Sequence, residues 1–307
     1  MVAALTRRAL VSLPVLAVAL SDCTATGSAR SGIVVTTNIL GDLVRNVVGD
    51  QTEVTVLMAA GADPHSFGVS AQQAASLERA ELLVHNGLGL EEGVLSHIEA
   101  ATASGVPDLA VGERVDPIDY SADESAGQPD PHFWTDPVRV GEAVGIIADQ
   151  VIEHVAGVDA DRVRSDAEAY RSQVDDLHEH TTELFSRIPD EHRKLVTNHH
   201  VFGYLAERYG FEVVGAVIPS GSTLASPSGS DLKDLADAVA ASGVPVVFAD
   251  SSQPERLIEA MAAETGLDIA IVPLFTESLT EPGQGAGTYL EMAAANAEAI
   301  AEGLAPQ

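Results

Sequence analysis

Three histidines and one glutamate occupy positions in this sequence where a ligand site can form. They are His65, His132, His199 and Glu277. Three of them come shortly after an apolar segment with the pattern of a β-strand, and His132 lies in a loop just before a helical segment. Ligands of open α/β sheets bind beyond the carboxyl ends of the strands. Imidazole nitrogen and carboxylate oxygen bind Zn²⁺ at about 2.0–2.2 Å, so these four side chains would suffice for a tetrahedral metal site.

Two adjacent histidines, His199 and His200, raise the question of which one belongs to such a site. Neighbours in a chain cannot easily bind one ion together. The strand pattern of residues 194–198 ends directly before His199, and we expect His200 to begin the following helix. The strand end therefore places His199 nearer to the site. Asp250 also ends a strand pattern, where it either hydrogen-bonds a ligand or caps the next helix.

Strand and helix patterns alternate along the chain and predict an α/β fold. Eight apolar segments read as strands: 32–37, 52–58, 81–86, 107–112, 194–198, 211–217, 245–250 and 268–273. Helical patterns lie between them, as at 71–80, 90–101, 230–241 and 254–265. Such alternation is typical of parallel sheets covered by helices on both faces. We expect two lobes, each a mainly parallel four-stranded sheet flanked by helices, with the site in the cleft between them.

One long helix is predicted to join the lobes. Residues 159–188 contain no glycine or proline, and their apolar residues recur at helical spacing. We therefore expect a stiff connection between an N-terminal lobe at 33–158 and a C-terminal lobe at 189–307. His178 and His180 lie two residues apart on this helix, so they point to different sides and are expected to be solvated.

The N-terminus has the pattern of an export signal. Two arginines precede an apolar run at residues 9–20, which is too short to span a bilayer. The only cysteine of the chain, Cys23, follows it, so residues 1–22 are predicted to be a signal peptide and residues 23–32 a flexible tether. Cys23 resembles the lipidation site of prokaryotic lipoproteins, although Asp22 departs from the small, uncharged residue usual there. The paired arginines also resemble, weakly, a twin-arginine signal.

The charge of the chain limits its partners. Sixteen basic and 46 acidic residues give a formal net charge of −30. Such a field repels nucleic acid and anionic membranes and attracts cations. The acidic, lysine-poor composition fits either a protein of high-salt surroundings or simply a solubilising surface.

Four motifs in order resemble the solute-binding proteins of zinc and manganese ABC transporters. They are "GADPH" at 61–65, "DPHFWTDP" at 130–137, "NHHVFGYLAERYG" at 198–210 and "FTES" at 275–278, and the resemblance extends from about Ile33 to Leu304. It implies that His65 and His132 are metal ligands. It also selects His199, which lies four residues before the Gly-Tyr pair of the third motif. The fourth ligand is usually aspartate, whereas this chain has Glu277.

The resemblance implies a receptor, not an enzyme. Such a protein captures a divalent metal outside the cytoplasm, on the outer face of the membrane if Cys23 is lipidated, and delivers it to an ABC permease. Three histidines favour zinc over manganese, which prefers more oxygen ligands. Metal binding would require the three imidazoles to be neutral, so protons are expected to compete for all three. A secreted zinc metallohydrolase and a metal-dependent adhesin are the alternatives, although the sequence has no HExxH motif.

Overall fold

The structure of the chain is a computed structural model that describes most of the sequence from Gly32 onward. The described residues are 32–121, 125–197, 199–218, 221–224, 228–243, 246–252, 259, 262–263 and 269–305. The predicted signal peptide, Cys23 and most of the predicted helix at 254–265 lie outside them. Among the described residues, no helix is both long and apolar enough to cross a membrane.

The N-terminal lobe contains a four-stranded parallel sheet. Its strands are β1 (Ile33–Val35), β2 (Val54–Val56), β3 (Leu82–His85) and β4 (Asp108–Ala110), in the order β2-β1-β3-β4. Successive side chains of β1 point to opposite faces: Ile33 and Val35 join one apolar cluster, and Val34 joins another. Because helices cover both faces, the central strands are apolar throughout, which explains their unbroken hydrophobic patterns.

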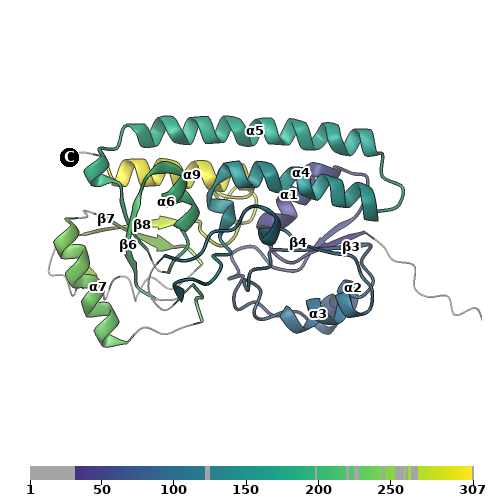
Figure 1. The fold of residues 1–307 in the computed structure, drawn as a ribbon, viewed down its shortest axis with the longest axis horizontal. Helices are drawn as coiled ribbons and strands as arrows, with labels where there is room; N and C mark the ends of the chain where they lie inside the picture. The colour runs from purple at the N-terminus through teal and green to yellow at the C-terminus, as the bar shows by residue number, and fades with distance from the viewer. Residues whose placement is uncertain are drawn as a thin grey trace, which may run out of the picture.

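The helices surround the two lobes in layers (Figure 1). Their bounds are α1 (Asn38–Val48), α2 (Ala71–Leu77), α3 (Leu95–Ala103), α4 (Pro137–His154), α5 (Ala160–Ser186), α6 (Gly203–Tyr209), α7 (Gly229–Ser242) and α9 (Tyr289–Gly303). In the N-terminal lobe, α1 and α4 lie on one side of the sheet and α2 and α3 on the other. The described helices thus form the flanking layers that the sequence predicts.

The C-terminal lobe also has four parallel strands, but they pair differently from the prediction. Strand β5 (Lys194–Thr197) pairs with β6 (Glu212–Ala216), and β7 (Val246–Asp250) pairs with β8 (Ala270–Leu274). The described strands thus form two parallel pairs instead of one continuous ladder, although β5 lies beside β7. The β5–β6 register also shifts between Leu195 and Val196, an irregularity that bends a strand locally.

Helix α5 runs along both lobes (Figure 1). It begins at Ala160, where the side chain of Asp159 accepts hydrogen bonds from the first turn, and it continues for 27 residues. Its buried residues join the core of the N-terminal lobe through Val163 to Leu177, and that of the C-terminal lobe through Phe185. Helix α5 is therefore packed into both lobes and does not act as an isolated spacer.

One expectation about this helix is wrong. His178 is half-buried, and its Nδ1 lies 2.9 Å from the hydroxyl of Tyr209, because α6 packs beside α5 at this point. His180 is exposed, as predicted.

Candidate metal centre

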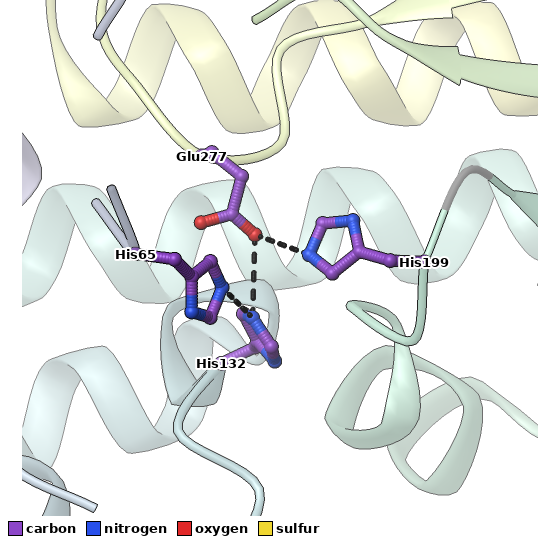
Figure 2. Close-up of side chains that lie close together, drawn as sticks. All are labelled: His65, His132, His199 and Glu277. Atoms are coloured by element: carbon purple, nitrogen blue, oxygen red, sulfur yellow. Dashed lines mark hydrogen bonds and ion pairs between the residues drawn. The ribbon is translucent and has the colours of Figure 1, made fainter. Parts of the chain in front are cut away.

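Four side chains from four separate loops meet between the lobes (Figure 2). They are His65, His132, His199 and Glu277, each no more than 1% exposed. One nitrogen or oxygen of each side chain lies within 4.8 Å of the corresponding atoms of the other three. This is the only such cluster of histidine, cysteine and acidic side chains within the described parts of the chain. The structure therefore brings together all four residues selected from the sequence.

His65 is held in the loop after β2 by a turn built on Asp63. The Oδ1 of Asp63 accepts a hydrogen bond of 2.9 Å from the backbone N–H of His65. Its Oδ2 accepts a 3.0 Å bond from the hydroxyl of Ser66. An aspartate whose side chain accepts a hydrogen bond from the backbone two residues on forms a local turn. The turn directs the imidazole of His65 into the site.

His132 is oriented by Asp130, a residue that the sequence analysis did not select. The Oδ1 of Asp130 lies 2.7 Å from His132 Nδ1 and also accepts a 2.9 Å bond from the His132 backbone N–H. A hydrogen bond at one ring nitrogen fixes which nitrogen remains for a ligand. The Nε2 of His132 is consequently the atom that faces the site. The Asp-Pro-His spacing could have indicated this role, because it allows the carboxylate of Asp130 to reach both the backbone N–H and the Nδ1 of His132.

Trp134 connects two of the loops that carry site residues. It lies in the short 3₁₀ turn that follows His132, and its Nε1 donates a 2.8 Å hydrogen bond to the carbonyl of Thr276. Its ring packs against that of His132 with centroids 5.2 Å apart. Because Thr276 precedes Glu277, this bond ties the loop of the N-terminal lobe to that of the C-terminal lobe.

His199 and Glu277 come from the carboxyl ends of β5 and β8. The Nε2 of His199 lies 2.9 Å from Glu277 Oε1, and the Nε2 of His132 lies 3.3 Å from the same oxygen. The Nε2 atoms of His132 and His65 are 3.4 Å apart. Glu277 Oε2 and the Nδ1 atoms of His65 and His199 are buried without a hydrogen-bond partner in the described structure.

The neighbouring His200 lies outside the cluster. Its ring packs near that of Tyr120, with centroids 6.4 Å apart, and it lines a hollow of about 390 Å³ together with Asp130 and Glu207. Asp250 ends β7 and is buried, and its carboxylate accepts hydrogen bonds from the N–H and hydroxyl of Ser252. Asp250 therefore forms a local turn close to the site.

The pKa values of the clustered side chains are shifted in different directions, so some favour the charged form and others the neutral form. Burial lowers the pKa of His65 to about 4. Burial also opposes protonation of His132, but the carboxylates of Glu277 and Asp130 outweigh it and raise its pKa to about 10. Although burial raises the pKa of Glu277, His132 and His199 hold it well below its usual range. At neutral pH the cluster thus contains an ion pair between protonated His132 and ionised Glu277, with His65 neutral.

Comparisons with known proteins identify the family and the fold of this chain. A family model described as "Zinc-uptake complex component A periplasmic" matches residues 33–303. The manganese-binding lipoprotein MntA of Halalkalibacterium halodurans is 29% identical over 283 residues, covering 91% of both chains. The zinc-binding protein TroA of Treponema pallidum is 28% identical over 277 residues, covering 89% of this chain and 88% of its own. The solved structure of the T. pallidum protein, a periplasmic zinc binding protein, has a TM-score of 0.82 at 28% identity and covers 91% of this chain and 100% of its own.

The pH dependence of metal affinity follows from the His132 proton. A metal ion that binds Nε2 of His132 must displace this proton at any pH below about 10, so affinity is expected to fall about tenfold per pH unit on acidification. From pH 7.5 to 5.5 the loss from this proton is therefore about 100-fold. His65 adds no competition above pH of about 4, so protons do not compete at all three imidazoles as the sequence suggested. Zinc calorimetry at several pH values, with circular dichroism as a folding control, measures the slope; a flat profile would contradict it.

Proposed function

Because the chain belongs to the family of zinc-uptake complex component A, we propose that it is the extracytoplasmic solute-binding protein of a metal ABC importer. It captures a divalent transition metal and delivers it to the permease. The observation that carries this proposal is the cluster of three imidazoles and one carboxylate, buried between two lobes. The metal is cargo, so the site has to bind it tightly and also release it.

His65, His132, His199 and Glu277 are proposed as the ligands of this cargo. Their ligand atoms are close enough to surround one ion. On binding, bonds to the metal would replace the contacts that these side chains make with one another. The carboxylate oxygen Glu277 Oε2 and the nitrogens named above are buried without hydrogen-bond partners among the described residues, which is costly unless another group binds them. A cation bound by both oxygens of Glu277 would compensate its Oε2, whereas His65 and His199 face the cluster with their Nε2 atoms.

A binding role fits the site better than hydrolysis. Catalytic zinc sites typically use three protein ligands and keep a fourth position for water. Here four potential ligands converge and each is almost completely buried, which favours a closed site. The relatives named above are likewise binding proteins by their names. No observation in the structure favours the alternative of an adhesin.

Zinc is the proposed cargo, with manganese as the alternative. Imidazole nitrogens suit zinc, and zinc stands above manganese in the usual order of affinity for divalent ions. Relatives of this chain are named for each metal, so the names do not decide between them. Three nitrogen ligands and a single carboxylate favour four-coordinate zinc over manganese, which prefers octahedral oxygen ligands.

The test of cargo identity is growth of a deletion strain starved of metal. Zinc is expected to restore growth only when the wild-type gene is present, and purified protein is expected to bind zinc more tightly than manganese. A strain that carries a variant lacking His65, His132 and His199 is the control for uptake through other routes. If manganese alone restored growth through the wild-type protein, the zinc assignment would be wrong.

The adjacent histidines allow a direct test of the ligand set. His199→Ala is expected to weaken zinc binding by more than about 100-fold, because loss of a group that merely supports a ligand already costs about 10–100-fold. His200→Ala, in a neighbouring residue of the same type, should change the affinity by less than about threefold. Calorimetry on both variants decides the matter, and equal losses would show that the choice of His199 is wrong.

Membrane anchoring through Cys23 is a separate proposal about residues outside the described structure. The basic residues, the apolar run, the single cysteine and the polar tether that follows are the pattern that supports it. Cys23→Ser protein is expected to leave the membrane fraction and appear in the soluble extracytoplasmic fraction, whereas wild-type protein stays with membranes. Immunoblots of fractionated cells measure the partition. A Cys23→Ser protein that remains fully with membranes would falsify lipid anchoring.

A further inference from the structure

Residues 221–223 of the C-terminal lobe lie directly on the N-terminal lobe. The carbonyl of Gly221 accepts a 3.1 Å hydrogen bond from the hydroxyl of Tyr120, and its N–H donates a 2.8 Å bond to Ser125 Oγ. The hydroxyl of Ser222 donates a 2.7 Å bond to Glu92 Oε1. The hydroxyl of Thr223 donates a 2.6 Å bond to Asp63 Oδ2. One short segment therefore makes four hydrogen bonds across the lobes.

Two of these partners also contact residues of the metal cluster. Asp63, which accepts the Thr223 bond through one oxygen, accepts the backbone N–H of His65 through the other at 2.9 Å. The hydroxyl of Tyr120, which bonds Gly221, lies 3.3 Å from His132 Nδ1. Segment 221–223 thus reaches both histidines of the N-terminal lobe through a single intermediate residue each.

The approach of the segment to Tyr120 depends on glycine. A Cβ atom built on Gly221 would overlap the ring and hydroxyl of Tyr120. The φ angle of Gly221 is not in the left-handed region, so the requirement is for space and not for an unusual backbone conformation. Any side chain at this position would push the segment away from the N-terminal lobe.

We propose that Gly221, Ser222 and Thr223 form a clasp between the lobes that positions His65 and His132 and slows release of the metal. The clasp is separate from the ligands, and it rests on the proposed function because the retained molecule is the metal cargo. Its hydrogen bonds form only while the lobes are together, so opening of the lobes must break them before the ligands separate. The clasp therefore acts mainly on the dissociation rate, as most interface contacts do.

The sharpest test uses Thr223, because valine has nearly the same shape without the hydroxyl. Thr223→Val removes a hydrogen bond to a carboxylate, so it is expected to raise the zinc dissociation rate about tenfold or more. Thr223→Ser retains the hydroxyl and should restore a rate close to that of wild type. Thr182→Val is the matched control, since this exposed threonine donates to the carbonyl of His178 on α5, away from the clasp, and should leave the rate unchanged.

Zinc dissociation is measured by stopped flow with a fluorescent chelator in excess. Gly221→Ala, which perturbs the clasp at its other end, is expected to accelerate release at least as much as Thr223→Val. Hydrogen exchange of the peptide that contains residues 221–224 provides a second readout. Zinc should slow exchange in wild-type protein and should slow it less in Thr223→Val, because the Gly221 N–H bonds across the lobes.

The outcomes separate the clasp from the proposed function. If wild-type protein retains zinc but Thr223→Val and Gly221→Ala release it at the wild-type rate, the clasp is wrong and the cargo assignment stands. If serine at position 223 fails to restore slow release, the hydroxyl bond to Asp63 is not the cause and the clasp is likewise overturned. If wild-type protein itself does not retain zinc, both proposals fall.

Discussion

A fully buried carboxylate surrounded by three imidazoles is the constraint on which the rest of this structure depends. An ionised carboxylate removed from water is strongly destabilising unless charged or hydrogen-bonded partners compensate it. Glu277 finds these partners in His132 and His199, which approach the same oxygen from different lobes. While the lobes are together, these contacts stabilise the buried charge, and much of the architecture supports this arrangement.

Several features of the fold keep the lobes in place. Helix α5 contributes buried side chains to the cores of both lobes, so their separation is set by a continuous rod of 27 residues. Asn38, at the start of α1, donates to the hydroxyl of Ser278 at 2.7 Å and accepts the N–H of Leu279 at 2.9 Å, immediately after Glu277. With the bond from Trp134 to Thr276, the loop that carries the carboxylate is fixed on both sides by residues of the N-terminal lobe. Glu277 is thus positioned chiefly through hydrogen bonds made by the adjacent residues of its own loop.

The sequence was sufficient to predict the strands and the four side chains that cluster, because both leave local signals. Apolar runs mark the eight strands of the described structure, and the clustered histidine and glutamate residues lie near strand ends, where parallel sheets bind ligands. The hydrogen bond from Thr223 to Asp63 joins residues 160 apart, and nothing in the local sequence indicates their contact. The pairing of the C-terminal strands and the contact of His178 with Tyr209 depend in the same way on tertiary packing. Asp130 is an intermediate example. Its spacing to His132 can be read from the sequence, but the direction of its carboxylate towards His132 Nδ1 cannot.

The proton on His132 has a consequence for the charge balance of the interior. The carboxylates of Glu277 and Asp130 raise the pKa of His132 to about 10, which favours a positive charge in the cluster at neutral pH. When a divalent cation enters and this proton leaves, the buried charge changes by one unit instead of two. The interior therefore exchanges one positive charge for two, so the net change in buried charge is smaller than the charge of the ion. Capture of the ion is therefore coupled to release of a proton, and discharge of the ion to the return of that proton.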